Sequence, residues 1–371
     1  MGTGLRLLFL LQNFRQGWGG APESVRLMAN YLSRKGIDAD VFDEGFICRD
    51  VGRLGSLPEP GALLDRFMLD SVSGYDAILL VGPWQNPLGL RRVFARRRKD
   101  QPVYYLPRGG LANIEFKWPR GPKKFPYFFA VERRFMDAAS GMIFSSTAEQ
   151  RETIPAALGR KPEHIIPDFV CHAANKMHRD RPEKDGFVTF GFLAEISLRK
   201  GLLPLVEAFV QWVHESNLKD RVRLVIGGGA RPGSEHYLEE VMAVLHANCD
   251  LDVEHQGPIS HSGRDGFYSE IDVMVVPTLF ESYGLTVIEA LTAGCVLLVT
   301  PKVGILEAIP AHESVIRASG ADVWSLKVGL KDAYRAAKCA NGGSRTTNME
   351  FWREVANGIN NKALDAWSKL L

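Results

Sequence analysis

Short apolar segments alternate with helix-like segments along most of the chain, and this alternation constrains the fold more than any other feature of the sequence. In the first half, strands are predicted at residues 5–11, 38–42, 77–81, 103–106, 142–145 and 164–167. Between the first two strands, residues 22–35 place their apolar side chains on one helical face. Alternating strands and helices predict a parallel sheet that is covered on both faces.

The same alternation restarts after residues 171–186, which are polar, lack periodicity and are predicted to be a linker. Beyond the linker, strands are predicted at residues 187–193, 223–226, 251–255, 273–277 and 296–299. Helices are predicted at residues 203–213, 235–245, 263–269, 284–293, 323–338 and 348–370. The 371 residues therefore predict two α/β domains, 1–170 and 187–371, with the last helix free to pack back on the first domain. In such folds a ligand binds at the carboxyl ends of the strands, here in a cleft that both sheets face.

Composition narrows the class of protein. With 46% hydrophobic and 24% charged residues, the chain is typical of a globular protein. Its five cysteines are scattered and include no C-x-x-C, so we expect no disulfide framework and a reducing cytoplasm. The apolar run 5–11 lacks a cleavage site and is interpreted as a buried strand rather than a signal peptide. Because histidines are dispersed and no D-x-D follows a strand in a suitable place, we expect no metal site.

Two glutamates lie eight residues apart in the segment 277–289, Pro-Thr-Leu-Phe-Glu-Ser-Tyr-Gly-Leu-Thr-Val-Ile-Glu. Glu281 falls just before a predicted helix, and Glu289 falls more than one turn inside it. The backbone N–H groups at the helix start therefore lie between the two carboxylates, where the helix dipole favours an anion. Carboxylates accept hydrogen bonds from hydroxyl groups, so this arrangement suits a ligand that is part sugar and part phosphate. Two solvated glutamates on a surface helix are the alternative.

Two cations precede another predicted helix. Arg199 and Lys200 stand at its amino end, where the dipole disfavours positive charge. Residues placed against that preference are candidate phosphate ligands. A pair of solvated surface charges is the alternative.

Two glycine-containing turns follow predicted strands of the first half, and glycine lets the backbone approach a ligand closely. The first contains Gly17, Gly19 and Gly20, but it has neither the G-x-G-x-x-G spacing nor a P-loop lysine. The second, at residues 106–111, places Arg108 at the end of a strand. Ordinary strand-to-helix connections are the alternative for both turns.

Positive charge is concentrated in the first half, where residues 1–180 carry a net charge of +7 and residues 181–371 carry −5. The stretch 91–134 holds 13 basic and 3 acidic residues with interleaved aromatic residues. Such a stretch suits an anionic membrane surface. Stacking on nucleic acid bases and a simple solvated face are the alternatives.

Taken in order, these motifs resemble the retaining, GT-B fold glycosyltransferases of family 4, also called glycosyl transferases group 1. The resemblance covers nearly the whole chain, is strongest over residues 187–310, and is most specific over residues 272–294. It implies two Rossmann-like domains that face a central cleft, with the acceptor bound by the first domain and the nucleotide sugar by the second.

The resemblance also implies roles for individual residues. Glu281 would contact the donor sugar, Glu289 would hold the ribose, and Lys200 would neutralise the diphosphate. Arg108 joins Glu281 and Lys200 in the implied catalytic set. The implied donor-binding set is Gly19, Gly20, Arg199, Ser282, Tyr283, Gly284, Leu285, Thr286 and Glu289. No cofactor and no metal are implied beyond the nucleotide sugar itself.

The chain departs from the family pattern at two positions. Where the family has Gly-Arg-Leu-Ser, this chain has Ala-Glu-Ile-Ser at 194–197, so Glu195 replaces an arginine. Arg199 is a candidate to compensate for that loss. The family's His-Gly turn becomes Arg108-Gly109, which exchanges a neutral ring for a fixed cation.

We therefore expect a retaining hexosyltransferase that moves a sugar from a UDP-, GDP- or ADP-linked donor to a hydroxyl of a glycan or lipid-linked acceptor. A cytoplasmic protein is expected, with peripheral attachment to the inner face of the cell membrane through residues 91–134 and no nucleic acid partner. The alternatives are a non-catalytic nucleotide-sugar-binding protein of the same fold, a sugar-nucleotide epimerase, or a nucleic-acid binder that uses the basic stretch.

Overall fold

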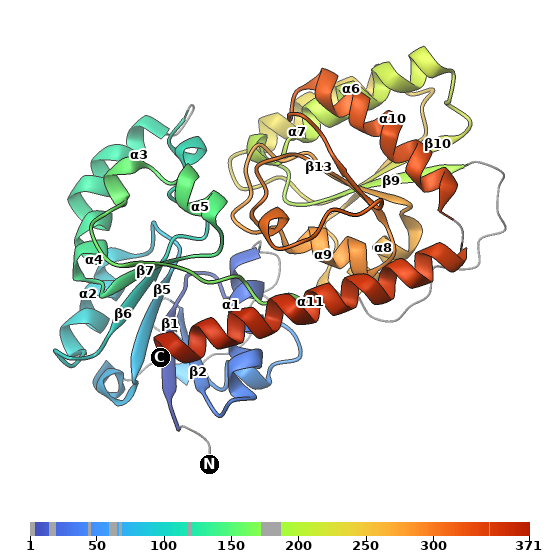
Figure 1. Cartoon of the computed structure of the whole chain (residues 1–371). Helices are drawn as coiled ribbons and strands as arrows, with labels where there is room; N and C mark the ends of the chain where they lie inside the picture. The colour runs from blue at the N-terminus through green and yellow to red at the C-terminus, as the bar shows by residue number, and fades with distance from the viewer. Residues whose placement is uncertain are drawn as a thin grey trace. The chain divides into compact units, whose positions relative to one another are not determined.

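The chain divides into two compact α/β units (Figure 1). The computed structural model describes residues 4–14, 20–43, 46–58, 65–66, 69–117, 121–171, 187–340 and 342–371. Unit 1 comprises Met1–Phe169 together with Ile359–Leu371, and unit 2 comprises Val170–Gly358.

Unit 1 is built on a sheet whose strand order, within the described residues, is β4-β3-β2-β1-β5-β6-β7-β8. The strands are β1 (Arg6–Leu10), β2 (Asp38–Asp43), β3 (Phe46–Cys48), β4 (Asp65–Arg66), β5 (Ala77–Val81), β6 (Val103–Leu106), β7 (Gly141–Phe144) and β8 (Glu163–Ile165). The six strands β2, β1, β5, β6, β7 and β8, in their order across the sheet, pair in parallel. At one edge, β3 and β4 add antiparallel pairings that the sequence did not predict, because strands of two or three residues are too short to show a periodic pattern.

Helices cover both faces of this sheet (Figure 1). They are α1 (Gly20–Ser33), α2 (Pro87–Arg96), α3 (Gly121–Tyr127), the π-helical turn η4 (Phe128–Glu132), α4 (Arg133–Ala138) and α5 (Thr147–Glu152). Asn86 caps α2 by accepting a hydrogen bond from the N–H of Leu88 at 3.0 Å. The last part of α11 (Gly342–Leu370) belongs to unit 1, where Asn360 donates a 2.7 Å hydrogen bond to the hydroxyl of Tyr31.

Unit 2 contains a second sheet, in which the described strands run in the order β11-β10-β9-β12-β13-β14 and all pairings are parallel. The strands are β9 (Val188–Leu193), β10 (Val222–Gly227), β11 (Val253–Gly257), β12 (Val273–Val276), β13 (Val296–Val299) and β14 (Val315–Arg317). Only the short edge strand β14 was not predicted from the sequence.

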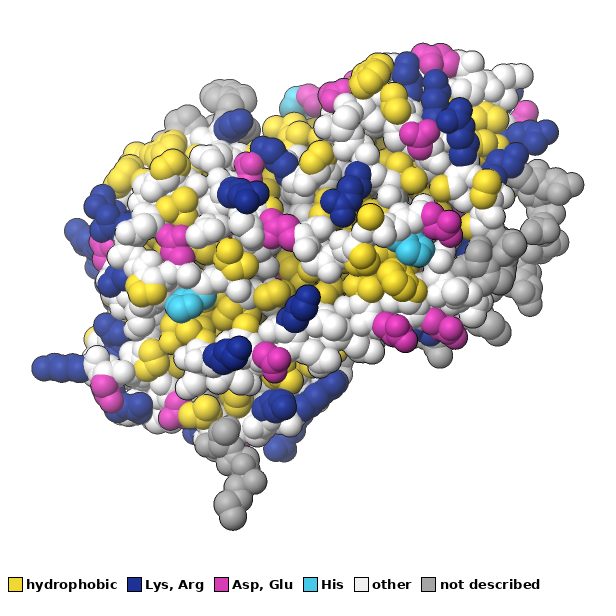
Figure 2. All heavy atoms as spheres, viewed as in Figure 1, with side chains coloured by type: hydrophobic (Ala, Val, Ile, Leu, Met, Phe, Trp, Pro, Cys, Tyr) yellow, Lys and Arg dark blue, Asp and Glu magenta, His cyan; other side chains and the backbone are white. Residues whose placement is uncertain are grey.

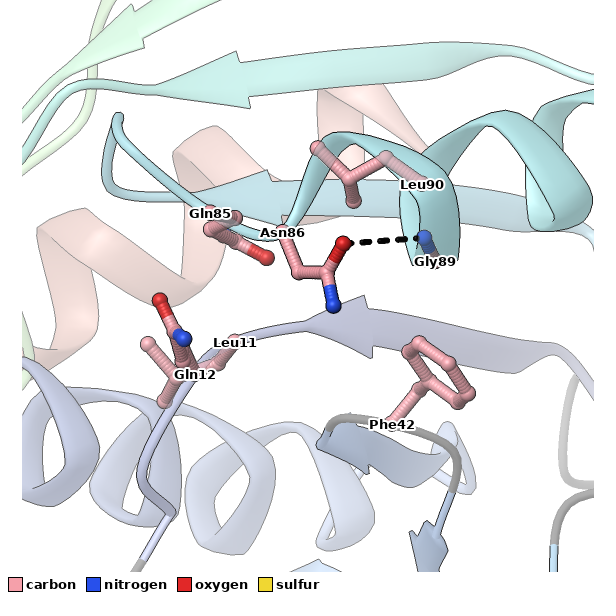
Figure 3. Close-up of a pocket in the computed structure, with 7 residues that line it drawn as sticks. All are labelled: Leu11, Gln12, Phe42, Gln85, Asn86, Gly89 and Leu90. Carbon is pink, nitrogen blue, oxygen red and sulfur yellow. Dashed lines mark hydrogen bonds between the residues drawn. The ribbon is translucent and has the colours of Figure 1, made fainter.

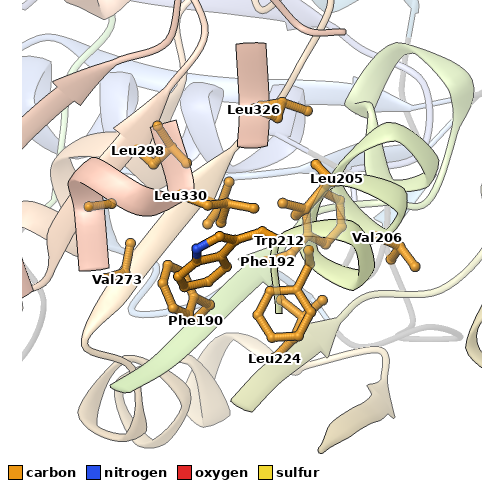
Figure 4. Packing of buried hydrophobic residues seen from close by; sticks show 14 of the residues in the cluster. Phe190, Phe192, Leu205, Val206, Trp212, Leu224, Val273, Leu298, Leu326 and Leu330 are labelled. Atoms are coloured by element: carbon orange, nitrogen blue, oxygen red, sulfur yellow. The ribbon is translucent and has the colours of Figure 1, made fainter. Parts of the chain in front are cut away.

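The helices of unit 2 lie on both faces of the sheet (Figure 1). They are α6 (Leu202–Ser216), α7 (Glu235–His246), α8 (Arg264–Glu270), α9 (Leu285–Thr292) and α10 (Val323–Cys339), and a 3₁₀ turn, η6 (Leu198–Lys200), precedes α6. Figure 4 shows the core beneath α6, where the buried indole of Trp212 packs edge-on against the ring of Phe190 from β9 at 5.5 Å. This packing fixes α6 on β9 and so positions the loop that joins them.

Candidate functional site

Three loops of unit 2 leave the carboxyl ends of the neighbouring strands β9, β10 and β12. They comprise residues 194–201, 228–234 and 277–284. Because the strands are parallel, the loops meet at one edge of the sheet, where α/β proteins bind ligands. Backbone hydrogen bonds tie them together: the N–H of Ile196 donates to the carbonyl of Gly229 at 2.8 Å, and that of Leu279 donates to the carbonyl of Arg199 at 2.8 Å.

Glycine permits this close approach of the loops at two positions. Gly201 has a φ of +70°, and a Cβ there would overlap the carbonyl oxygen of Pro277. Gly228 has a φ of +138°, and a Cβ there would overlap the carbonyl oxygen of Ala194. Both positions combine a backbone conformation that side chains disfavour with a lack of space, so the loop arrangement depends on glycine.

The loops bring Glu281 together with both predicted cations. The ammonium of Lys200 donates a hydrogen bond to Oε2 of Glu281, and Nη1 of Arg199 lies 3.7 Å from the same oxygen. Arg199 also donates to the carbonyl of Phe280 at 3.2 Å. Each of the three charged side chains retains between 15 and 19% of its exposure, so the cluster is largely buried but open to a ligand at its rim.

Electrostatics keep Glu281 ionised. Burial raises the pKa of its carboxyl group, but the positive charges of Lys200 and Arg199 and the hydrogen bond from Lys200 outweigh burial, so the pKa falls below its ordinary value. The cluster therefore presents a carboxylate between two cations at neutral pH.

Glu195 extends this cluster instead of opposing it. Its Oε1 lies 3.5 Å from Nη2 of Arg199 and 3.9 Å from Nη1 of Arg231, which follows the Gly-Gly-Gly end of β10. Charges thus alternate from Arg231 through Glu195, Arg199 and Glu281 to Lys200. Within this row of three cations and two acids, the net charge is positive. The sequence did not indicate Arg231, because only the fold places it beside Glu195.

The predicted donor-binding residues 282–286 form the turn into α9. Gly284 is the N-cap residue, with a φ of +101°, and a Cβ there would lie 2.7 Å from Cγ1 of Val303. A glycine N-cap offers no side chain to the first N–H groups of the helix, which are the groups that bind anions in other proteins. Tyr283 and Gly284 are buried, and Ser282, Leu285 and Thr286 are partly exposed.

Glu289 lies on α9 in a separate cluster. Its carboxylate is buried and accepts hydrogen bonds from Nη1 of Arg264 at 3.1 Å and from the hydroxyl of Tyr268 at 2.8 Å. The Sγ of Cys171 lies 3.6 Å away. Burial, and then the charge of Glu289, raise the pKa of Tyr268 well above its ordinary value, so its hydroxyl remains a donor. No sequence pattern indicates Arg264 or Tyr268, which reach Glu289 only through the packing of α8 on α9.

Arg108 lies in unit 1, in the turn after β6, and adopts a φ of +51°. Its buried guanidinium forms an ion pair with Asp168. The next N–H, that of Gly109, donates to Glu149 at 2.5 Å. Burial raises the pKa of Glu149 above its ordinary value. Arg108 and the hydrogen bonds from Ser145 and Gly109 oppose this rise without cancelling it. Arg108 is therefore a cation with its own partner in unit 1, and its predicted catalytic role stays a prediction.

The glycine-rich loop is only partly described. Gly19 lies outside the described residues, and Gly20 is the first residue of α1. Figure 3 shows a small hollow nearby in unit 1, lined by Leu11, Gln12, Phe42, Gln85, Asn86, Gly89 and Leu90. The amide of Gln85 is held by the carbonyls of Leu10 at 2.9 Å and Val81 at 2.6 Å. The hollow thus lies where β1 and β5 end.

Two kinds of feature are absent from the described part of the chain. No group of three or more histidine, cysteine, aspartate and glutamate side chains there is arranged to hold a metal ion. None of its helices combines the length and hydropathy needed to span a membrane.

Much of unit 2 resembles a known protein family. Residues 187–331 match the family model described as Glycosyl transferases group 1, and this segment contains the three loops and both glutamates. The D-inositol 3-phosphate glycosyltransferase of Xylanimonas cellulosilytica is 26% identical over 242 residues, which are 59% of this chain and 55% of that protein. Glycogen synthase of Bacillus subtilis is 24% identical over 150 residues, 39% of this chain and 29% of that protein. The chain thus spans about half or less of the length of these curated relatives.

Solved structures resemble the chain over nearly its full length. Sucrose-phosphate synthase from Thermosynechococcus elongatus has a TM-score of 0.67 and 17% identity, and the match covers 98% of this chain and 100% of that one. Anabaena HepE, solved in complex with UDP-glucose, has a TM-score of 0.68 and 16% identity with the same coverage. These likenesses confirm the predicted fold, GT-B with two parallel α/β sheets.

Proposed function

We propose that this chain is a retaining glycosyltransferase that moves a hexose from a nucleoside-diphosphate sugar to a hydroxyl group of a glycan or lipid-linked acceptor. The observation that carries the proposal is the cluster of Glu281, Lys200 and Arg199 at the strand ends of a segment that matches Glycosyl transferases group 1. A carboxylate beside two cations can hold a sugar hydroxyl and a diphosphate at the same time.

In the proposed reaction, the bond between the sugar and the diphosphate breaks, and negative charge develops on the leaving diphosphate. Lys200 and Arg199 stabilise that charge from fixed positions, which lowers the barrier without reorganisation. The amino end of α9, entered through residues 282–286, supplies N–H groups to the same phosphates. Since these groups supply the positive charge, we propose a metal-independent reaction with no cofactor.

The remaining predicted residues receive roles in the same proposal. Glu281 accepts hydrogen bonds from hydroxyl groups of the donor sugar. Glu289 accepts hydrogen bonds from the ribose hydroxyl groups, once the contact of Glu289 with Arg264 or Tyr268 has rearranged. Gly19 and Gly20 bring their loop to the donor phosphates. The acceptor binds to unit 1, where Arg108 fixes the turn after β6. Attack from the face that the leaving group vacates gives retention of configuration.

Among donors, UDP-glucose is the first to test, because HepE was solved with that molecule. GDP- and ADP-linked sugars are the other candidates. A thermal-shift screen with UDP, GDP, ADP and their sugars identifies the nucleotide, and a transfer or donor-hydrolysis assay then tests turnover. Replacing Glu281 with alanine is expected to abolish transfer while leaving the fold intact, as circular dichroism would show.

One observation favours a second candidate, a non-catalytic nucleotide-sugar-binding protein. Glu195 places a second acid in a cluster that must bind an anion. Tight nucleotide binding without turnover on any donor would favour this candidate. Near-normal turnover of the Glu281→Ala variant would instead show that the site has been assigned to the wrong residues.

A further inference from the structure

The helical run of α3, η4 and α4 in unit 1 turns an apolar face outward. Phe125 and Phe129 are 41% and 49% exposed, and Pro126 and Ala130 beside them are also exposed. Surface helices ordinarily present polar residues on this side. Two exposed phenylalanines one turn apart therefore mark a surface that is suited to bind something.

The run is held in this orientation by a buried anchor. Glu132, at the end of η4, accepts hydrogen bonds from the hydroxyl of Tyr105 at 2.6 Å and from the N–H of Trp84 at 3.0 Å. Burial raises the pKa of Glu132, and these two hydrogen bonds oppose the rise. The inward side chains of the run near Glu132 fill the core of unit 1. These side chains are Phe128, Phe135 and Met136. Phe125 packs its ring on that of Phe116 at 4.8 Å, but both Phe125 and Phe129 remain exposed outside this core.

Cations flank the apolar face. Lys123 and Arg134 are exposed on the same run, and the guanidinium of Arg133 lies 5.8 Å from the ring centre of Phe129. Helix α2 packs against α4 through the rings of Phe94 and Phe135, 5.4 Å apart. It adds further exposed cations, Arg91, Arg92 and Arg96, followed by Lys99. Figure 2 shows hydrophobic side chains gathered over α3 with lysine and arginine side chains beside them.

We propose that the exposed side of this run, which carries Phe125 and Phe129 together with the cations Lys123 and Arg134, docks on an anionic lipid bilayer. Exposed phenylalanines insert among acyl chains, and cations near them are attracted to a negatively charged surface. A helix with an apolar centre and basic flanks is the form that interfacial helices take. A nucleic acid would contact the cations. Proteins that bind single strands stack bases on aromatic side chains inside a groove, whereas these two phenylalanines face outward.

The proposed membrane contact therefore involves only part of the basic stretch 91–134, the exposed side of the α3–η4–α4 run with its neighbouring cations. Residues 118–120 of that stretch lie outside the described residues and take no part in the argument. An inner leaflet rich in anionic lipids would place unit 1 beside lipid-linked acceptors. Docking itself does not depend on sugar transfer, and its test does not use turnover.

Co-sedimentation of the full chain with vesicles tests the proposal. Binding is expected to vesicles of equal parts phosphatidylglycerol and phosphatidylcholine, to weaken with added salt, and to be much weaker to phosphatidylcholine alone. Phe125→Ser with Phe129→Ser should lower partitioning by roughly tenfold, since two apolar side chains no longer enter the bilayer. Lys123→Gln with Arg134→Gln should lower it by roughly tenfold at low salt only.

The matched control lies on α10, where Trp324 and Val328 are 65% and 40% exposed and stand one turn apart. Trp324→Ser with Val328→Ser should leave partitioning unchanged, and all variants should keep the nucleotide-induced thermal shift of the unchanged chain. Equal binding to both vesicle types, full binding by the phenylalanine variant, or loss of binding only in the α10 variant would each overturn the proposal. Preferential capture of single-stranded RNA over anionic vesicles would overturn it as well.

Discussion

Lys200 donates a hydrogen bond to Oε2 of Glu281, although the two residues are 81 positions apart in the sequence. The contact joins η6, after β9, to the loop after β12, and it holds cation and carboxylate together before any ligand binds. A diphosphate that binds Lys200 would take the place of Glu281 and leave its carboxylate available to sugar hydroxyls. The pair is thus the point at which diphosphate binding and sugar binding become linked.

The lowered pKa of Glu281 predicts an acid-dependent loss of stability. Burial raises the pKa of Glu281, but Lys200 and Arg199 lower it by more, so the pKa lies below its ordinary value of 4.5. The ionised form is therefore favoured by folding, so its stabilisation is present above about pH 4.5 and is lost as the pH falls through the folded-state value. Glu281→Gln should unfold more easily than the unchanged chain at pH 7, and the difference should shrink in acid. Denaturant unfolding of both proteins between pH 7 and pH 3 measures this, and a constant difference would contradict the assignment.

The row of alternating charges predicts a role for Arg231 in donor affinity. Arg231→Ala removes the outermost cation, and we expect the KM for the donor to rise about tenfold with little change in kcat, as for the loss of one charge-assisted phosphate contact. Arg231→Lys should recover part of the affinity, because it restores charge without the planar fork. Arg335→Ala, on the exposed side of α10, is the control and should leave KM unchanged. Equal KM values for the Arg231 and Arg335 variants would remove Arg231 from the site.

Much of this architecture follows from local sequence patterns. Strands such as β1 and β12 are runs of apolar residues, and α6 and α10 have a clear apolar face, so their positions were predicted closely. The contact between Glu281 and Lys200 was not itself predicted, although the resemblance assigned both residues to the donor and parallel strands place their carboxyl ends at one edge.

The partners of the site residues could not be predicted in the same way. Arg231 meets Glu195, and Arg264 meets Glu289, only after strands and helices distant in sequence have packed. Neither contact has a spacing that the sequence reveals. The departure at Glu195 was visible from the sequence as an acid in place of an arginine, but its position between two arginines needed the structure.

Two glycines with nearly equal φ angles allow the cost of backbone strain to be measured apart from the cost of steric overlap. Gly201 and Gly257 have φ values of +70° and +71°, but a Cβ on Gly201 would overlap the carbonyl oxygen of Pro277, whereas one on Gly257 meets nothing within 4 Å. Gly257→Ala should cost about 1–2 kcal/mol of unfolding free energy, the cost of a left-handed alanine. Gly201→Ala should cost more and should also displace Lys200, with loss of transfer.

Urea unfolding and donor kinetics on both glycine variants measure the two effects. The expected pattern is a normal KM and kcat for Gly257→Ala and a fall in kcat/KM of at least tenfold for Gly201→Ala. Similar stability and activity in the two variants would show that the loops move apart easily, and the tight packing of residues 194–201 on 277–284 would then not position the cluster.

Tyr268 offers a test of whether Glu289 binds the nucleotide. Its hydroxyl donates to Oε2 of Glu289 at 2.8 Å, and both side chains are buried. Tyr268→Phe removes one donor from a buried carboxylate, so the unfolding free energy should fall by about 1–3 kcal/mol. If Glu289 holds the ribose, loss of a hydrogen bond that competes for the same carboxylate should also change the affinity for the nucleotide.

Tyr75 provides the matched control in unit 1, where its hydroxyl donates to Oδ2 of the buried Asp40 at 2.6 Å. Tyr75→Phe should lose a similar amount of stability, since the chemistry of the two pairs is the same, but it should leave nucleotide affinity unchanged. Calorimetric titration with the nucleotide identified by the thermal-shift screen separates the two effects. Unchanged affinity in Tyr268→Phe, together with the loss of stability, would assign Glu289 and Tyr268 to the packing of α8 on α9 and not to the ligand.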